Sequence, residues 1–223
     1  MESRPRALSS VMRGLECTLA ALSLPLACYL VTRILYREGD VRLYVVWLAL
    51  GLHVVGQALC LSVPREATGR GLLGVSLALT AAGMLISPGG LFLHTLLPDY
   101  TLHFGDLPVA IALPGSVVLG GLCQTAALLP YLLFLKRLAY FLNKPELAKR
   151  ANMILFVWVL GLASACLAAG PRLGARGGEL ALLGLVGAVI AAFLGGVVMV
   201  QLVFRLRLAV AERILQQTPG AQP

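Results

Sequence analysis

The stretch HTLLPDYTLHFGD, residues 94–106, gathers two histidines and two aspartates in a chain that is otherwise mostly apolar. Imidazole nitrogens and carboxylate oxygens are acceptable ligands for a divalent metal ion. The spacing argues against a preset metal site, because Pro98 and Gly105 interrupt any short element that could hold the four side chains together. We therefore expect an ordered polar cap, and a metal or proton site is the alternative. The four candidate ligands are His94, Asp99, His103 and Asp106.

The composition of the whole chain indicates a membrane protein. Of its 223 residues, 59% are hydrophobic and only 13% are charged, whereas soluble domains carry about 25% charged residues. Such a chain has too few charges to cover a water-exposed surface. The lipid bilayer is therefore the first partner that the sequence predicts.

Six apolar runs are long enough to cross the hydrocarbon core as helices, which takes about 20 residues. The fourth run is over-long and contains Pro114 and Pro130, which predicts a kink or an interfacial continuation. The fold expected is an all-α polytopic bundle of about six transmembrane helices, forming a single domain over residues 1–223. The runs are approximately Leu15–Ile34, Val41–Val63, Gly71–Leu93, Leu107–Leu135, Ala151–Gly170 and Leu180–Phe204.

The basic residues predict the orientation of this bundle. If both termini lie on one side, 13 of the 18 lysines and arginines fall on that side, and such an excess is typical of the cytoplasmic face. The loop at 94–106 contains no lysine or arginine and is expected outside. The Arg-, Ala-, Leu- and Gly-rich composition favours a bacterial source and hence the cell inner membrane. No nucleic-acid partner is expected, because the basic residues flank apolar runs instead of forming the face of a soluble module.

Three polar residues fall at mid-membrane depth. His53 and Gln57 lie one helical turn apart in the second run, and Gln124 lies in the fourth. Polar side chains at this depth usually face the interior of a bundle, so we expect a neutral histidine bonded to neighbouring helices. One alternative is that these side chains line the path of a small permease or channel. The other alternative is a haem- or metal-binding redox protein with Met84 as a second axial ligand. The shortage of mid-depth histidines argues against this alternative, and we expect no cofactor.

Small residues predict where helices pack closely, since helices in lipid associate by close backbone approach. One row of small residues, Gly74, Ala78 and Ala82, lies in the third run. These faces serve contacts within the bundle or with other membrane subunits, including a second copy of the chain. The main row repeats every four residues in the last run, as Gly184, Ala188, Ala192 and Gly196.

No catalytic motif is present in the sequence. It contains no Walker loop, no GxSxG, no HExxH and no dinucleotide-binding GxGxxG. The function that the sequence favours is an accessory or scaffold subunit that packs through its small-residue faces. The permease or channel and the redox protein stand as alternatives.

Overall fold

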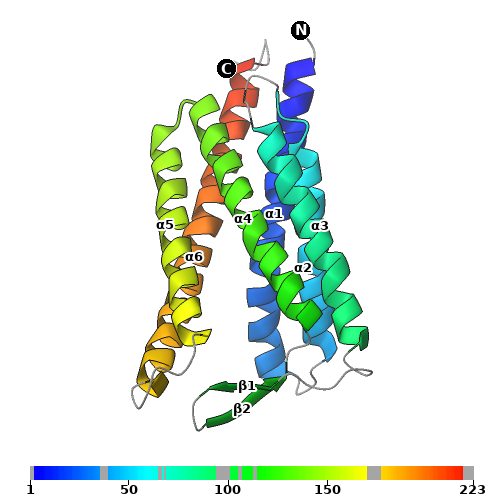
Figure 1. Cartoon of the computed structure of the whole chain (residues 1–223). Coiled ribbons are helices and arrows are strands. Elements are labelled where there is room, and N and C mark those ends of the chain that lie inside the picture. Colours follow the sequence, from blue (N-terminus) through cyan, green and yellow to red (C-terminus); the bar gives the residue numbers. More distant parts are fainter. Residues whose placement is uncertain are drawn as a thin grey trace.

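The computed structural model describes residues 3–35, 40–64, 67, 69–93, 101–104, 107–112, 115–169 and 177–217. Within these residues six α-helices run up and down in one bundle, and the start of the first helix and the end of the last lie at the same end (Figure 1). The helices are α1 (Ser3–Leu35), α2 (Asp40–Cys60), α3 (Arg70–Leu93), α4 (Gly115–Phe141), α5 (Pro145–Ala169) and α6 (Gly177–Gln217).

The bundle is built from three antiparallel helix hairpins, because α1 packs chiefly on α2, α3 on α4 and α5 on α6. In the first hairpin the two backbones touch at a pair of glycines. A Cβ atom on Gly14 would lie 2.6 Å from the backbone oxygen of Gly56, and a Cβ atom on Gly56 would lie 2.7 Å from the backbone oxygen of Gly14. Any other residue at either position would force the two helices apart.

Glycines close the other two hairpins in the same way. A Cβ atom on Gly83 of α3 would lie 2.8 Å from the backbone oxygen of Gly120 in α4. Between α5 and α6, a Cβ atom on Gly161 would lie 2.9 Å from the Cβ atom of Ala191. Close backbone approach of this kind is the usual contact between helices in lipid.

The small-residue row expected on the last run is partly buried and partly exposed in the structure. Gly184 is buried and Ala188 half-buried, but Ala192 and Gly196 are exposed, and nothing lies within 4 Å of a Cβ atom built on Gly196. The reason is geometric. A helix has 3.6 residues per turn, so a row that repeats every four residues drifts around the axis by about 40° at each step. The contact with α5 is made instead by the neighbouring residues, among them Ala191.

The structure corrects the fourth predicted span, Leu107–Leu135. Its first part, Leu107–Ala112, is a β-strand, β2, which pairs antiparallel with β1 (Thr101–Phe104). The helix α4 begins only at Gly115. Prolines at 108 and 114 bracket a run too short for a helix, and proline supplies no backbone N–H donor. Two β-branched residues, Val109 and Ile111, recur with the two-residue period of a strand.

Two helices extend far beyond their predicted spans. The 41 residues of α6 make a helix about 60 Å long, roughly twice the thickness of a hydrocarbon core. The 33 residues of α1 extend past the predicted start at Leu15. The additional turns carry charged side chains. Arg207 Nη2, in the additional turns of α6, lies 2.8 Å from Oε1 of Glu16, which falls within the predicted span of α1.

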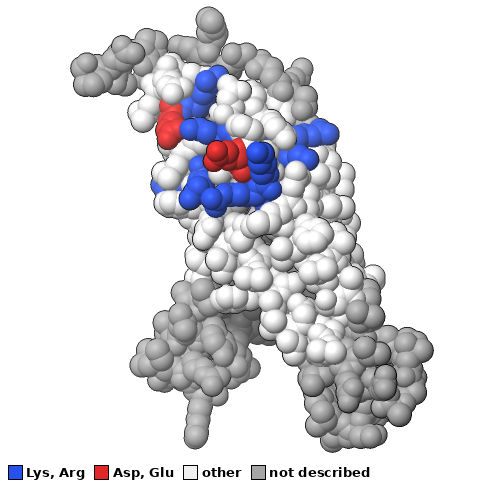
Figure 2. All heavy atoms as spheres, turned by 90° about the vertical axis from the view of Figure 1, so that its left-hand side faces the viewer, with Lys and Arg blue, Asp and Glu red and all other residues white. Residues whose placement is uncertain are grey.

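Charged side chains gather at the end of the bundle where α1 begins and α6 ends. Among the side chains that the structure describes, eleven are lysine or arginine and three are glutamate. On the face shown in Figure 2 the charged side chains lie toward one end, and the described surface below them carries no charge. The largest buried side chains lie in the same half of the bundle and include Tyr131, Phe134, Leu135, Leu138, Leu202 and Leu206.

The turn between α4 and α5 fixes the direction of the third hairpin. Asn143 takes a left-handed conformation with φ of 57°. The Lys144 N–H donates to the oxygen of Ala139 at 2.9 Å, and the Asn143 N–H donates to that of Tyr140 at 3.0 Å. This is the Schellman arrangement of a helix C-terminus, and Pro145 then begins α5.

Three of the described helical segments are long and apolar enough to cross a membrane: Leu122–Phe141, Pro145–Ser164 and Val186–Gln217. Two further apolar segments, Leu48–Cys60 and Arg70–Ile86, are shorter. The structure therefore shows a helical bundle compatible with membrane association.

The glycine contact predicts the effect of adding one methyl group. Gly14→Ala should destabilise the protein by about 1–3 kcal/mol, because the new Cβ atom meets the backbone of α2. Gly74→Ala is the matched control, since nothing lies within 4 Å of its Cβ position, and it should stabilise α3 by about 0.5–1 kcal/mol. Denaturant unfolding in detergent measures both changes. Equal effects of the two substitutions would contradict the contact.

Candidate binding pocket in the bundle

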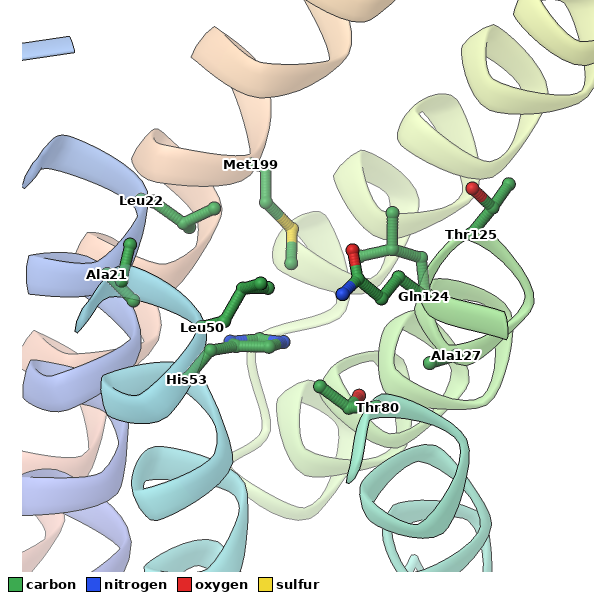
Figure 3. A pocket seen from close by; sticks show the side chains of 11 residues that line it. Ala21, Leu22, Leu50, His53, Thr80, Gln124, Thr125, Ala127 and Met199 are labelled. Carbon is green, nitrogen blue, oxygen red and sulfur yellow. The ribbon is translucent and has the colours of Figure 1, made fainter. Parts of the chain in front are cut away.

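A pocket of about 420 Å³ lies midway along the bundle, among α1, α2, α3, α4 and α6. It is partly open, and Figure 3 shows its lining side chains. None of the described residues that line it is charged, and the apolar ones are in the majority. The lining residues are Ala21, Leu22, Ala49, Leu50, His53, Thr80, Gln124, Thr125, Ala127, Leu128 and Met199.

His53 of α2 is held by the residue one helical turn later. The Nε2 atom of Gln57 lies 2.8 Å from the Nε2 atom of His53. In this orientation the amide nitrogen of Gln57 donates to the ring, whereas the opposite orientation of the amide would make the ring nitrogen the donor. The second ring nitrogen, Nδ1, and Gln57 Oε1 are both buried and have no hydrogen-bond partner among the described residues. Since Nδ1 has almost no accessible surface, it lies behind the pocket wall.

A ladder of hydrogen bonds runs from Gln57 to α3 and α4. The fully buried Gln57 donates to Thr80 Oγ1 at 3.4 Å, and Thr80 donates to the backbone oxygen of Ser76 at 2.9 Å. The Ser76 hydroxyl donates in turn to the backbone oxygen of Ala127 in α4 at 2.8 Å. Helices α2 and α3 touch far less than the partners within each hairpin, so the Gln57–Thr80 bond is a principal link between the first two hairpins.

Tyr131 closes the pocket toward the charged end. It lies one turn of α4 beyond the lining residues Ala127 and Leu128 and is completely buried. Its ring meets that of His53 edge to face with centroids 5.2 Å apart. Its hydroxyl donates to Thr18 Oγ1 of α1 at 3.2 Å. Beyond Tyr131 the packed core fills the space between the helices.

Gln124 supplies the polar group on the wall formed by α4. Its amide points into the pocket, toward the side where His53 and Leu50 lie (Figure 3). Gly83 makes this placement feasible: a Cβ atom at that position would lie 2.8 Å from Gln124 Cγ. A larger residue in α3 would displace the amide.

The structure brings some of the predicted site residues together. His53 and Gln124 line one pocket, and Gln57 lies behind His53. Met84, the suggested second haem ligand, is half-buried and does not line it. In the part of the chain that the structure describes, no three His, Cys, Asp or Glu side chains are grouped as a metal site.

The polar loop that opened the sequence falls mostly outside the described residues. This holds for His94, Asp99 and Asp106. His103 lies in β1, where the pairing with β2 becomes irregular between Leu102 and Phe104. The cap and the metal site at this loop both stay predictions.

Several residues of this network are not recognised from the sequence. Thr18, Ser76, Thr80 and Tyr131 are single polar residues in apolar runs. One signal could have found them: Thr18 lies four residues after Gly14, and Thr80 lies three residues before Gly83. A hydroxyl one turn from a contact glycine is well placed to bond a neighbouring helix.

The pairing of Gln57 with His53 predicts non-additive substitutions. Gln57→Leu should destabilise the protein by about 1–3 kcal/mol, because it leaves a buried imidazole nitrogen without a partner. The double variant Gln57→Leu with His53→Leu should lose about 0.5–1.5 kcal/mol less free energy of unfolding than the sum of the losses in the two single variants. Denaturant unfolding in detergent measures the cycle, with Gln201→Leu on the exposed side of α6 as the control. Strict additivity would mean that the two side chains are not coupled.

Comparison with known proteins gives no relative from which to transfer a function. No protein-family model matches the chain, and no curated protein or solved structure matches it. A function must therefore be inferred from the side chains themselves.

Proposed function

We propose that the protein is a six-span protein of a bacterial inner membrane, with its charged end and both termini in the cytoplasm. The excess of eleven basic over three acidic described side chains at this end supports the orientation, because lysine and arginine are enriched on the cytoplasmic side of membrane helices. The lengths of α1 and α6 also support it, since both helices exceed the hydrocarbon thickness. Their excess length carries Arg6 and Arg13 in α1 and Arg205, Arg207, Glu212 and Arg213 in α6.

The outer surface of the third hairpin fits a lipid environment. Large apolar side chains are exposed along both of its helices, with Phe156 and Phe193 each 68% exposed. Contiguous apolar surface of this extent is unusual on a soluble monomer. The other exposed members of this surface include Val159, Leu160, Leu183, Val186, Val189, Ile190, Leu194 and Val197.

Within this membrane the chain acts as an accessory or scaffold subunit that packs against another helix. The observation that carries this proposal is the exposure of Ala192 and Gly196 in the midst of bulky neighbours. Each hairpin of this chain has a glycine at a close contact, against a backbone oxygen in the first two hairpins and against the Cβ atom of Ala191 in the third. The Ala192–Gly196 face also consists of small residues and is exposed among the described residues. The partner is another membrane subunit or a second copy of the protein.

A small permease is the second candidate, favoured by one observation: His53 and Gln124 line the same pocket at mid-depth. Binding sites of transporters lie near the bilayer midplane. In this conformation the core around Tyr131 fills the space toward the charged end, so transport would require a second conformation.

The orientation predicts the location of reporter enzymes. A reporter that is active only in the cytoplasm should be active when fused after Gln217. One that is active only in the periplasm should be active when inserted in the loop between the strands, at 105–106. Activity of the periplasmic reporter at the C-terminus would contradict the six-span topology.

The docking role predicts that a bulky residue on the exposed row alters association but not folding. Ala192→Ile should change stability by less than about 0.5 kcal/mol, as exposed substitutions usually do, while reducing the mass of the complex purified in mild detergent. Ala163→Ile, exposed on α5, is the control and should leave that mass unchanged. Mass spectrometry of the intact complex reads out both. An unchanged complex in Ala192→Ile would remove the support for a docking role at this row.

A further inference from the structure

We propose that the mid-bundle pocket is a binding site for an uncharged, lipid-soluble molecule that carries a hydroxyl or carbonyl oxygen on an apolar chain. This inference rests on the proposed membrane location but not on the accessory role. It assigns the pocket a ligand class, which neither of the candidate functions above specifies.

The size and polarity of the pocket define the class of ligand. Its volume of about 420 Å³ falls within the range of small-molecule sites, about 300–1,000 Å³. No described lining residue carries a charge, and an ion at this depth would be costly to bury without a partner. Most of the wall is aliphatic, from Leu22, Leu50 and Leu128. The ligand is therefore neutral and mainly apolar.

The polar groups define what the ligand must carry. The imidazole of His53 forms part of the wall, but its unpaired Nδ1 atom has almost no accessible surface, so a molecule in the pocket does not reach it. On the opposite wall the amide of Gln124 points into the pocket (Figure 3) and can both donate and accept. A hydroxyl on the ligand satisfies the oxygen or the N–H of this amide, and a carbonyl oxygen satisfies its N–H.

The surroundings define how the ligand lies. Tyr131 and the core beyond it close the pocket toward the charged end, and the polar head of the ligand meets the Gln124 amide on the wall formed by α4. The apolar chain leaves through the open part of the pocket. Met199 of α6, whose thioether points into the pocket (Figure 3), is flexible enough to pack against chains of different shape.

Photo-crosslinking tests this site with a defined probe. Hexadecanol carrying a diazirine in its chain is incorporated with the full-length protein into phosphatidylethanolamine–phosphatidylglycerol vesicles and illuminated, and the labelled peptides are identified by mass spectrometry. We expect label in Leu48–Cys60 and Leu122–Phe141 at helix positions that face the pocket. Label confined to the exposed residues of α5 and α6 would overturn the proposal, since it would report surrounding lipid alone.

Two leucines of α2 make a matched pair of variants. Leu50 lines the pocket, whereas Leu48 is 57% exposed. Leu50→Trp fills the pocket and should lower the pocket label about tenfold or more, while Leu48→Trp should leave it within about twofold. Gln124→Leu keeps the approximate shape of the side chain but removes the amide, and should lower the label about fivefold to tenfold, as expected for one lost hydrogen bond. Undiminished label in Leu50→Trp would overturn the proposal.

The same probe separates this proposal from the membrane assignment. If the protein fails to float with the vesicles, the membrane location is wrong, and labelling is then repeated in mild detergent micelles. Pocket label that depends on Leu50 in micelles would support the site independently of the bilayer. A melting curve of each variant confirms that lost label does not reflect unfolding.

Discussion

The contact on which this bundle depends is the direct approach of two helix backbones at glycine. Gly14 and Gly56 leave no room for even one methyl group between α1 and α2, and Gly83 and Gly161 do the same in the other hairpins. In a bilayer, apolar side chains gain little by leaving lipid for protein, so van der Waals contact and hydrogen bonds must hold helices together. Glycine maximises the van der Waals contact between two helices, and the three hairpins result from such contacts.

Hydrogen bonds then join the hairpins that glycine forms. Gln57 reaches from the first hairpin to Thr80 of the second, and Tyr131 reaches back from the second to Thr18 of the first. The third hairpin is attached at the charged end, where Arg207 meets Glu16. Polar side chains that hold helices together at mid-depth also leave a polar wall wherever the helices separate. The pocket therefore lies at the seam between hairpins and not inside one.

How much of this could be read from the sequence depends on which physical signal each feature leaves. Long apolar runs predict the helices well, because such runs are recognised from their length and composition alone. The strand at Leu107–Ala112 is not predicted from the sequence, because the apolar run there favours a membrane helix and Pro108 alone does not exclude one. His53, Gln57 and Gln124 stand out as polar residues in apolar runs, but their meeting around one pocket depends on helix rotation. Helix rotation also determines which members of the row from Gly184 to Gly196 are buried within the chain and which are exposed.

The helix α6 connects the two surfaces to which function is attributed. On its inner side it contributes Met199 to the pocket, and on its outer side it exposes Ala192 and Gly196. Its hairpin packs with the core at the charged end and leans away from the other helices at the opposite end (Figure 1). The angle of this hairpin is set by the packing of α6 on α1 and of α5 on α4. A partner bound at Ala192 and Gly196 and a ligand bound in the pocket would therefore contact the same helix. Binding at one site would affect binding at the other only if both favour, or oppose, the same angle of that helix.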